Sequence, residues 1–164
     1  IDSYGIITEL AGEKLRVRQG GRGAEIILVE ENESFRGAPV VFNQEDIRQV
    51  QLAKAALRTA IDVLMEEAGL EYKKLERVYL AGAFGNYLNP HNAVDIGMIP
   101  PIKTDTIRNI GNAAAAGAIA ALLSPDKQRE AREIKEQVRY VELALYPDFQ
   151  SLYLNNLNFD PAAK

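Results

Sequence analysis

The amino-acid sequence predicts one α/β domain, and three observations carry that prediction. The first 42 residues hold short β-forming runs separated by glycine-containing breaks. From residue 43 onward, apolar residues recur with the spacing of a long amphipathic helix. A hydrophobic strand over 75–80 and an alanine-rich helix over 107–123 then follow it. No repeat or linker interrupts the 164 residues, so we expect a single domain, 1–164, with a strand-rich start (1–42) and an α/β part (43–164).

Four short strands are expected in the strand-rich start. Runs over 5–10 and 15–18 are separated by a hairpin-like segment, and 24–30 is the strongest strand candidate. A further run covers 37–42. Because proline has no backbone N–H to donate, Pro39 is expected either at the start of this strand or in a strand at the sheet edge.

The long helix has clear signals at both ends. Asn43 is a typical N-cap residue, and Glu45 and Asp46 place carboxylates in the first turn, where they meet the positive end of the helix dipole. Gly69 is the predicted C-cap. Between these ends the apolar face comprises Ile47, Val50, Leu57, Ile61, Leu64 and Ala68.

The second half of the chain continues with alternating elements. The strand over 75–80 runs directly into a turn of small residues over 81–86. After the alanine-rich helix, a charged helix is expected over 126–137 and a strand over 139–145. Pro147 is expected to open a final amphipathic helix.

Composition and charge exclude several classes of function. The formal net charge is −4 and no basic run is present, so nucleic acid is not expected as a partner. The longest weakly polar stretch, 112–123, is far shorter than the ~20 residues of a membrane span, and no signal peptide is visible, which predicts a cytoplasmic location.

The chain contains no cysteine and one histidine, His91. Disulfides, a thiolate zinc site, an iron–sulfur cluster and a thiol nucleophile are therefore excluded within this chain, and no metal site is predicted. We also find no catalytic residue. Because the sequence opens at Ile1 without a methionine, we expect either a removed leader or a piece of a longer protein.

The strand-to-turn junction over 78–86 is the most informative segment. Gly82 and Gly85 allow a backbone to approach a ligand closely, and ligands of open α/β sheets lie at the carboxyl ends of strands. A tight strand–helix connection explains the same residues equally well. The segment lacks the full dinucleotide fingerprint, and the chain has no phosphate loop of the Gly-Lys-Ser/Thr type.

Two further features have both a functional and a structural interpretation. The small residues that follow Gly111 permit close packing on a flat ring, although an alanine-rich core helix is the commoner cause. On the long helix, Arg48, Gln51 and Lys54 are spaced by three residues and form one polar stripe. A solvated charged face explains that stripe equally well.

Taken in order, four segments resemble one protein family, the C-terminal part of the reductive activators of corrinoid enzymes. They are Gln44-Glu45-Asp46-Ile47-Arg48 with Gln51-Leu52-Ala53-Lys54-Ala55-Ala56, then Leu80-Ala81-Gly82-Ala83-Phe84-Gly85-Asn86-Tyr87, Ile96-Gly97-Met98-Ile99-Pro100 and Gly111-Asn112-Ala113-Ala114-Ala115-Ala116-Gly117-Ala118. The resemblance covers nearly all of the chain from residue 44 onward.

The resemblance implies a fold and an activity. Such proteins join a [2Fe-2S] ferredoxin-like domain to an ATPase domain of the actin, Hsp70 and sugar-kinase superfamily, in which nucleotide lies between two ribonuclease H-like halves. They use ATP with Mg²⁺ to drive an electron onto a Co(II) corrinoid. This chain would be one ribonuclease H-like half, a mixed sheet flanked by helices. Its implied partner is a corrinoid protein or corrinoid-dependent methyltransferase, and a homodimer is compatible with the resemblance.

The resemblance also implies binding residues for ATP or ADP. The adenosine turn would comprise Gly82, Ala83, Phe84 and Gly85, with Asn86 beside it. Gly111 and Asn112 would flank the adenine at the start of the next helix. Three side chains of the long helix would reach the ribose or adenine: Arg48, Gln51 and Lys54.

Two alternatives stay open at this point. The cluster ligands, phosphate hairpins and catalytic carboxylate would lie upstream of Ile1, so the chain is not expected to hydrolyse ATP alone. This half does not distinguish a corrinoid activator from another kinase or ATPase of the superfamily. A non-enzymatic module that docks a partner through the strand-rich start or the last helix is the other alternative.

Overall fold

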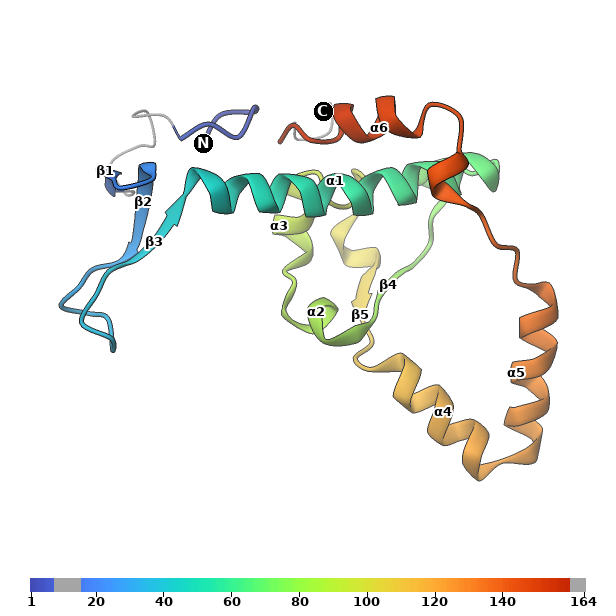
Figure 1. The fold of residues 1–164 in the computed structure, drawn as a ribbon. Coiled ribbons are helices and arrows are strands. Elements are labelled where there is room, and N and C mark those ends of the chain that lie inside the picture. The colour runs from blue at the N-terminus through green and yellow to red at the C-terminus, as the bar shows by residue number, and fades with distance from the viewer. Residues whose placement is uncertain (8–15, 160–164) are drawn as a thin grey trace.

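The structure, a computed structural model, describes residues 1–7 and 16–159, apart from the side chains of Phe84 and Asn86. Figure 1 shows a long central helix, with strands at its start and further elements above and below it. The first strand was expected over 5–10. Residues 5–7 are not in a strand, and residues 8–10 lie outside the described residues.

A three-stranded antiparallel sheet forms the strand-rich start. Its strands, in the order β1-β2-β3, are Arg16–Gly20, Gly23–Val29 and Val40–Asn43. The prediction for Pro39 is confirmed, because β3 begins at the next residue and lies at the sheet edge. Ile26 of β2 packs with Ile7 and Ile47 in a small core at the start of the long helix.

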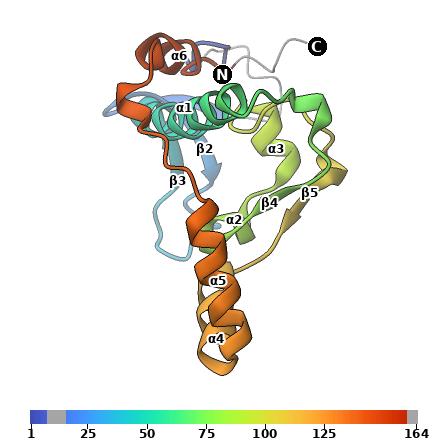
Figure 2. The same ribbon diagram turned by 90° about the vertical axis from the view of Figure 1, so that its right-hand side faces the viewer.

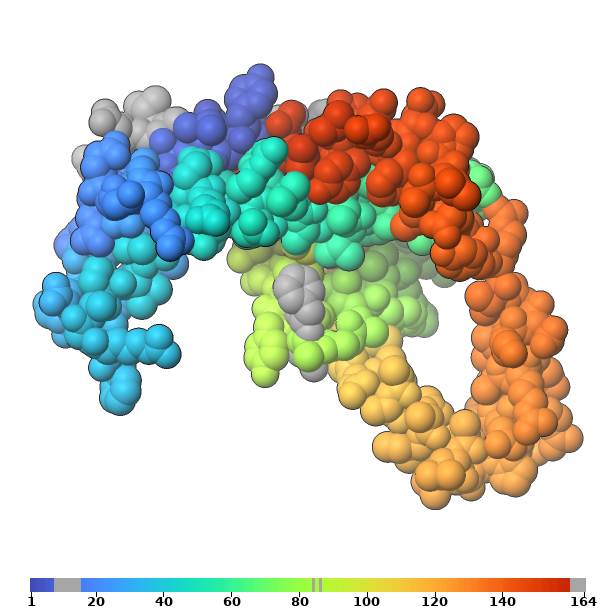
Figure 3. Space-filling view, in the orientation of Figure 1, coloured from blue at the N-terminus to red at the C-terminus, as the bar shows by residue number. Residues whose placement is uncertain are grey.

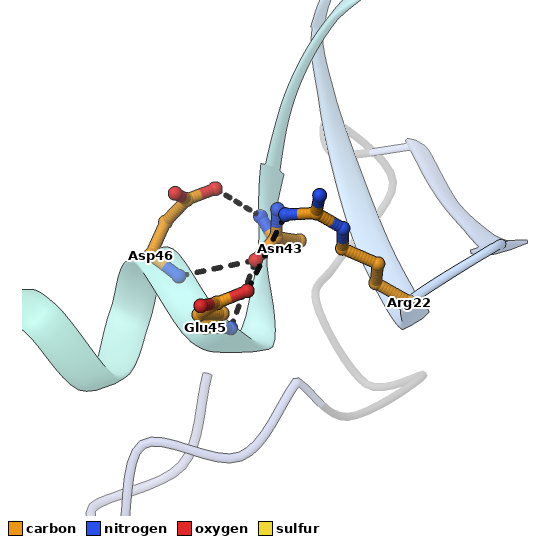
Figure 4. Close-up of polar contacts among 4 residues, drawn as sticks. All are labelled: Arg22, Asn43, Glu45 and Asp46. Carbon is orange, nitrogen blue, oxygen red and sulfur yellow. Dashed lines mark hydrogen bonds and ion pairs between the residues drawn. The ribbon is translucent and has the colours of Figure 1, made fainter.

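The long helix α1 spans Gln44–Glu67 and is capped as predicted at its start. The Asn43 side chain accepts hydrogen bonds from the backbone N–H groups of Glu45 (2.8 Å) and Asp46 (3.1 Å), and the Asp46 carboxylate accepts one from the Asn43 N–H (3.0 Å). Figure 4 shows this reciprocal capping box, with Arg22 reaching Glu45 from the β1–β2 turn.

At the other end of α1 the C-cap is Ala68, one residue before the predicted Gly69. Gly69 has φ +63° and its N–H donates to Glu66, while the N–H of Leu70 donates to Met65. This is a Schellman motif, in which glycine takes the left-handed position after the cap.

Beneath α1 lies a second, two-stranded parallel sheet of β4 (Val78–Leu80) and β5 (Ile107–Asn109). Four short helical elements belong to the same region: η1 (Tyr72–Lys74), α2 (Gly82–Tyr87), α3 (Pro90–Asp95) and η2 (Thr104–Thr106). A core of Ala93, Met98, Ile99 and Ile107 joins α3 to the two strands, with Val78 and Leu80 of β4 packed against it. The mixed α/β class is confirmed, although the described strands form two separate sheets and not one mixed sheet.

The predicted helix over 107–123 is divided in the structure. Residues 107–109 are β5, and helix α4 begins only at Ala113 and ends at Leu123. Pairing of Ile107 with Val78 draws the first residues into the sheet, and Gly111, at φ +64°, separates strand from helix. The charged helix α5, Pro125–Gln137, contacts α4 after a sharp turn at Ser124, and the two helices diverge from that turn (Figure 1). Both project from the body of the molecule (Figure 2).

The expected strand over 139–145 is wrong. In the described structure no neighbouring strand pairs with it, and its last three residues form a 3-10 turn, η3 (Leu143–Leu145). The final helix α6 spans Phe149–Asn155 and packs along α1. It begins two residues after the predicted Pro147, because Asp148 takes a left-handed conformation at φ 61°. No helix in the described part of the chain is long and apolar enough to cross a membrane.

Candidate functional site

Two glycine turns lie side by side at the carboxyl ends of β4 and β5. Each strand runs into a glycine with positive φ, Gly82 at +86° after β4 and Gly111 at +64° after β5. The two strands are parallel and in register from Val78 with Ile107 to Leu80 with Asn109. Both turns therefore open at the same edge of the sheet, where ligands of α/β proteins bind.

Backbone hydrogen bonds join the two turns directly. The N–H of Gly82 donates to the carbonyl of Gly111 at 2.7 Å, and the N–H of Ile110 donates to the carbonyl of Leu80 at 3.0 Å. The Gly111 carbonyl also accepts from Ala113 at 2.9 Å, at the first residue of α4. The position of one turn is thus fixed by the other.

The two glycines of the first turn have different surroundings. A Cβ added at Gly82 would meet no atom within 4 Å, so open space lies against its Cα. A Cβ at Gly85 would lie 3.0 Å from the carbonyl carbon of Leu80. The lack of a side chain at Gly82 therefore leaves open space beside the turn. At Gly85 it lets α2 pack closely on the end of β4.

The start of α4 completes the turn region. The Asn112 side chain accepts a hydrogen bond from the N–H of Ala115 at 3.1 Å, so this residue is the N-cap of the helix. Its amide oxygen is held by the helix, which leaves its amide nitrogen as the donor that could face a ligand. Gly111 and Asn112 lie beside the first turn, and their predicted place flanking the adenine stays a prediction.

An apolar cavity of about 200 Å³ lies behind the first turn. It lies between α1 and β4 and is open to solvent on one side, where Leu57 and Tyr79 are about half exposed. Its lining residues are Leu57, Ile61, Tyr79, Leu80, Ala81, Gly85, Leu88, Met98 and Ile99. Ala81 and Gly85 of the turn line one side of this cavity.

The three polar residues predicted on α1 do not share one environment. Arg48 is exposed and contacts the Gln51 side chain at 3.4 Å. Gln51 is 2% exposed, and its amide nitrogen donates to the carbonyls of Tyr4 and Leu157, each at 3.0 Å. These carbonyls belong to the two terminal segments, which Figure 1 shows above α1, on the side away from α2 and β5.

Lys54 is likewise 2% exposed and faces the carboxyl-terminal segment. Its ammonium group donates to the carbonyl of Asn158 and lies 5.5 Å from the ring centre of Phe159. A buried ammonium needs such partners, because an unpaired charge in the interior is costly. The contacts of Gln51 and Lys54 give both residues a structural role, fastening the chain ends to α1.

The sequence did not single out a polar cluster at the far end of α1. Asp62 accepts hydrogen bonds from Arg58 (2.8 Å), from the Tyr72 hydroxyl and from Asn156 (3.0 Å). Burial, followed by the hydrogen bond to Asp62, raises the pKa of Tyr72 from 10.0 to about 12. The cluster ties α6 and η1 to α1, and the spacing of Arg58 and Asp62 by four residues is the signal that could have found it.

The prediction of no metal site stays a prediction. In the described residues no group of three or more acidic or histidine side chains could hold an ion. His91 is exposed, and its Nε2 lies 3.0 Å from the Thr104 hydroxyl. This pair joins α3 to η2 and lies outside the two glycine turns.

Comparison with known proteins shows which family the chain belongs to. A sequence model of the C-terminal domain of RACo, described as its ASKHA domain, matches residues 1–163. The chain belongs to this family. RACo proteins are reductive activators of corrinoid proteins, so the family resemblance found in the sequence is confirmed.

Relatives of the RACo domain support the same assignment. The chain is 39% identical, over 132 residues, to "Corrinoid activation enzyme RamQ" of Eubacterium limosum, covering 80% of this chain and 22% of that protein. It is 26% identical, over 125 residues, to "[Co(II) methylated amine-specific corrinoid protein] reductase" of Methanosarcina barkeri, covering 75% and 23%.

A solved structure of a "Reductive activator for corrinoid,iron-sulfur protein" matches the fold with a TM-score of 0.86. It is 31% identical, and the match covers 100% of this chain and 26% of that one. The chain thus spans about a quarter of the length of the relatives it matches.

Within this RACo domain the predicted residues fall into two groups. Gly82, Ala83 and Gly85 lie at the first turn, and Gly111 and Asn112 adjoin it. Phe84 and Asn86 also lie in α2, and their side chains fall outside the described residues. Of the three residues on α1, Arg48 alone is exposed to solvent, whereas the other two contact the terminal segments.

Proposed function

We propose that this chain is the adenosine-binding half of an ATP-dependent reductive activator that drives an electron onto the Co(II) corrinoid of a partner protein. The observation that carries the proposal is the pair of hydrogen-bonded glycine turns with open space against Gly82. A flat adenine ring could approach the Gly82 Cα at van der Waals distance, because no side chain fills that position.

The residues of the turn would bind and orient the nucleotide and would not carry out chemistry on it. Backbone of Gly82 and Ala83 would face the ring on one side, and Gly111 with Asn112 would limit it on the other. Of the three polar residues predicted on α1, Arg48 alone is exposed, and its contact with Gln51 puts it on the side of the terminal segments, so we assign no α1 side chain to the nucleotide. ATP with Mg²⁺ would supply the free energy that makes an unfavourable electron transfer proceed.

The electron source must lie in another part of the protein. The chain contains no cysteine, so it cannot supply the thiolate ligands of a [2Fe-2S] cluster. The relatives extend over about four times the length matched here, which leaves room for such a domain. The partner that the names of the relatives favour is a corrinoid protein.

The experiment that tests nucleotide binding is a Gly82→Val substitution in the longer protein. A branched side chain would occupy the open space where adenine should lie, and we expect the dissociation constant for ADP, measured by calorimetry, to rise at least about tenfold. The matched control is Gly69→Val, since Gly69 also has a positive φ (+63°) and no atom within 4 Å of its added Cβ. Both variants place a β-branched residue at a positive φ, but only Gly82 lies at the predicted adenosine turn.

Two results would contradict the proposal. Equal ADP affinity in the Gly82→Val variant and the native protein would make the turn purely structural. Absence of any ADP binding or thermal stabilisation in the native protein would favour the docking-module alternative, because a saturating ligand must raise the melting temperature.

A further inference from the structure

We propose that a groove at the end of α1, bounded by η3 and α6, is a docking surface for a separate protein, and that it takes an exposed segment in which lysine or arginine side chains flank an apolar one. The inference goes beyond nucleotide binding and does not depend on it. Figures 1 and 2 show α6 on one side of α1 and β4 with β5 on the other, so the groove lies away from the two glycine turns.

The groove is a hollow of about 500 Å³ where three segments meet. They are the last residues of α1, the connection over 142–148 that contains η3, and the start of α6. Figure 3 shows the surface of α6 and of the chain before it, in orange and red, lying along the end of α1. A hollow of this size accommodates a few side chains of a protein segment.

One part of the groove wall is apolar. It is formed by Leu145, Tyr146, Pro147 and Leu152. Leu145 is 82% exposed, so most of its side chain meets solvent in the described structure. Covering this wall with an apolar side chain would remove both surfaces from water, which favours binding in proportion to the area buried.

The rest of the wall is acidic. Its side chains are Glu66, Glu67, Glu142 and Asp148. In the part of the chain that the structure describes, Arg139 is the one cation that forms an ion pair with any of them, through Glu67. Four carboxylates and one guanidinium leave a formal charge of −3 here, against −4 for the whole chain. The net negative charge of the chain is therefore concentrated at this groove.

The tyrosine in the groove senses the same negative charge. Burial, followed by a hydrogen bond to Glu66 and by the charges of Glu66, Glu67 and Asp148, raises the pKa of the Tyr146 hydroxyl. A phenolate would add a further negative charge to the carboxylates, so the phenol keeps its proton. A cation brought into the groove would instead be attracted by all of these groups.

The walls of the groove are fixed relative to each other. The Asn156 side chain donates to Asp62 at 3.0 Å and to the Thr59 hydroxyl at 3.1 Å, which ties the end of α6 to α1. The N–H of Phe149 donates to the carbonyl of Tyr146 at 3.1 Å and joins the connection to the start of α6. A surface that is already ordered loses little conformational freedom when a partner binds.

The partner follows from this combination of shape and charge. Carboxylates at the rim attract lysine or arginine and repel acidic segments, and complementary charge sets both the choice of partner and the rate of association. The apolar wall selects an apolar side chain between the cations, as at the centre of other protein interfaces. A basic, partly apolar segment of another protein fits both requirements.

Labelled peptides test the groove in the longer protein. The probes are two acetylated peptides of equal length, one of alternating lysine and leucine and one of alternating glutamate and leucine. Binding is followed by fluorescence polarisation at low salt. We expect the dissociation constant of the lysine peptide to be lower by about tenfold or more, and to rise as salt is added.

Matched charge variants show whether binding occurs at the groove. One variant carries Glu66→Gln, Glu142→Gln and Asp148→Asn, which remove three charges and keep oxygen acceptors in place. Its control removes three charges from exposed positions of α5: Glu130→Gln, Glu133→Gln and Glu136→Gln. We expect the groove variant to bind the lysine peptide about tenfold or more weakly and the control variant to bind it like the native protein.

A second pair tests the apolar wall. Leu145→Ser should weaken the lysine peptide by about threefold or more, because a polar side chain replaces the exposed leucine. Leu154→Ser is the control, on a residue of α6 that is 55% exposed and outside the groove lining, and should have no effect. Dissociation constants for ADP should be the same in all four variants, so a failure here leaves the proposed nucleotide site standing.

Four results would overturn the proposal. They are equal affinity for the two peptides, equal weakening by the groove and α5 charge variants, no effect of Leu145→Ser, and no binding of the lysine peptide by the longer protein. Sedimentation gives a further test, because a dimer of the longer protein that dissociates in the groove variant would assign the groove to a second copy of the chain instead.

Discussion

Gln51 and Lys54 show how a polar stripe on a helix can have a purely structural use. Both side chains are almost fully buried, and both donate hydrogen bonds to backbone carbonyls of the carboxyl-terminal segment. Gln51 also holds Tyr4, and the N–H of Phe159 donates to the carbonyl of Ser3 at 2.7 Å. The two residues therefore fasten both ends of the domain to one helix, and the ends to each other.

This role predicts the effect of Gln51→Leu. The substitution removes the donor from the buried hydrogen bond to Leu157 and from the partly buried one to Tyr4, and an unsatisfied buried group costs about 1–3 kcal/mol. We expect the free energy of unfolding, measured by urea denaturation, to fall by about 2 kcal/mol. Gln49→Leu, on an exposed position of the same helix, is the control and should change it by less than about 0.5 kcal/mol. Normal stability with weakened ADP binding in the Gln51→Leu variant would instead establish a ligand contact.

At the scale of single elements, α1 and α4 differ in the contacts that stabilise them. Helix α1 has a capping box, a Schellman motif and buried residues along its length. Helix α4 has its Asn112 cap, but no buried residue, and it contains Gly117. Stability of α4 in the isolated chain therefore depends on its own helix propensity and on the contact with α5.

Gly117→Ala measures this dependence. A Cβ at Gly117 would meet no atom within 4 Å, so in the 164-residue chain the substitution should raise the free energy of unfolding by about 1 kcal/mol through helix propensity alone. Gly85→Ala is the control of opposite sign, since its Cβ would press on Leu80 at 3.0 Å. A loss of stability from Gly117→Ala in the short chain would show that α4 is already covered there.

At the scale of the whole molecule, the described residues form two separate small cores. One core joins the three-stranded sheet to the start of α1, and the other lies among α3, β4 and β5 beneath the helix. The α4–α5 hairpin belongs to neither core, and Figure 2 shows it extending away from both. Such a shape is that of a component of a larger fold.

Small-angle scattering of the 164-residue chain tests that shape. A compact domain of this length has a radius of gyration of about 15 Å. With the hairpin extended, we expect a clearly larger value and a distance distribution with a long tail. A radius of gyration near 15 Å for the monomer would mean that the hairpin folds back onto the body in solution.

Local chemistry accounts for the parts of the fold that the sequence predicted. Asn43, Asp46 and Gly69 act through hydrogen bonds to backbone groups within a few residues of themselves, so their roles are visible in the sequence. The glycine turn after β4 is likewise a local feature, because a strand that runs into closely spaced small residues must turn there.

Tertiary structure alone decided the rest, because those features depend on partners distant in the chain. Residues 107–109 became a strand through pairing with residues 78–80, and residues 139–145 stayed out of a sheet where no such partner was present in the described structure. Gln51 became an internal anchor because Leu157, more than one hundred positions later, lies against it. The sequence by itself determined the family and the location of the glycine turns. The hydrogen bond between Gly82 and Gly111, which brings two turns into one site, required the folded chain, because it joins residues that only the parallel sheet places side by side.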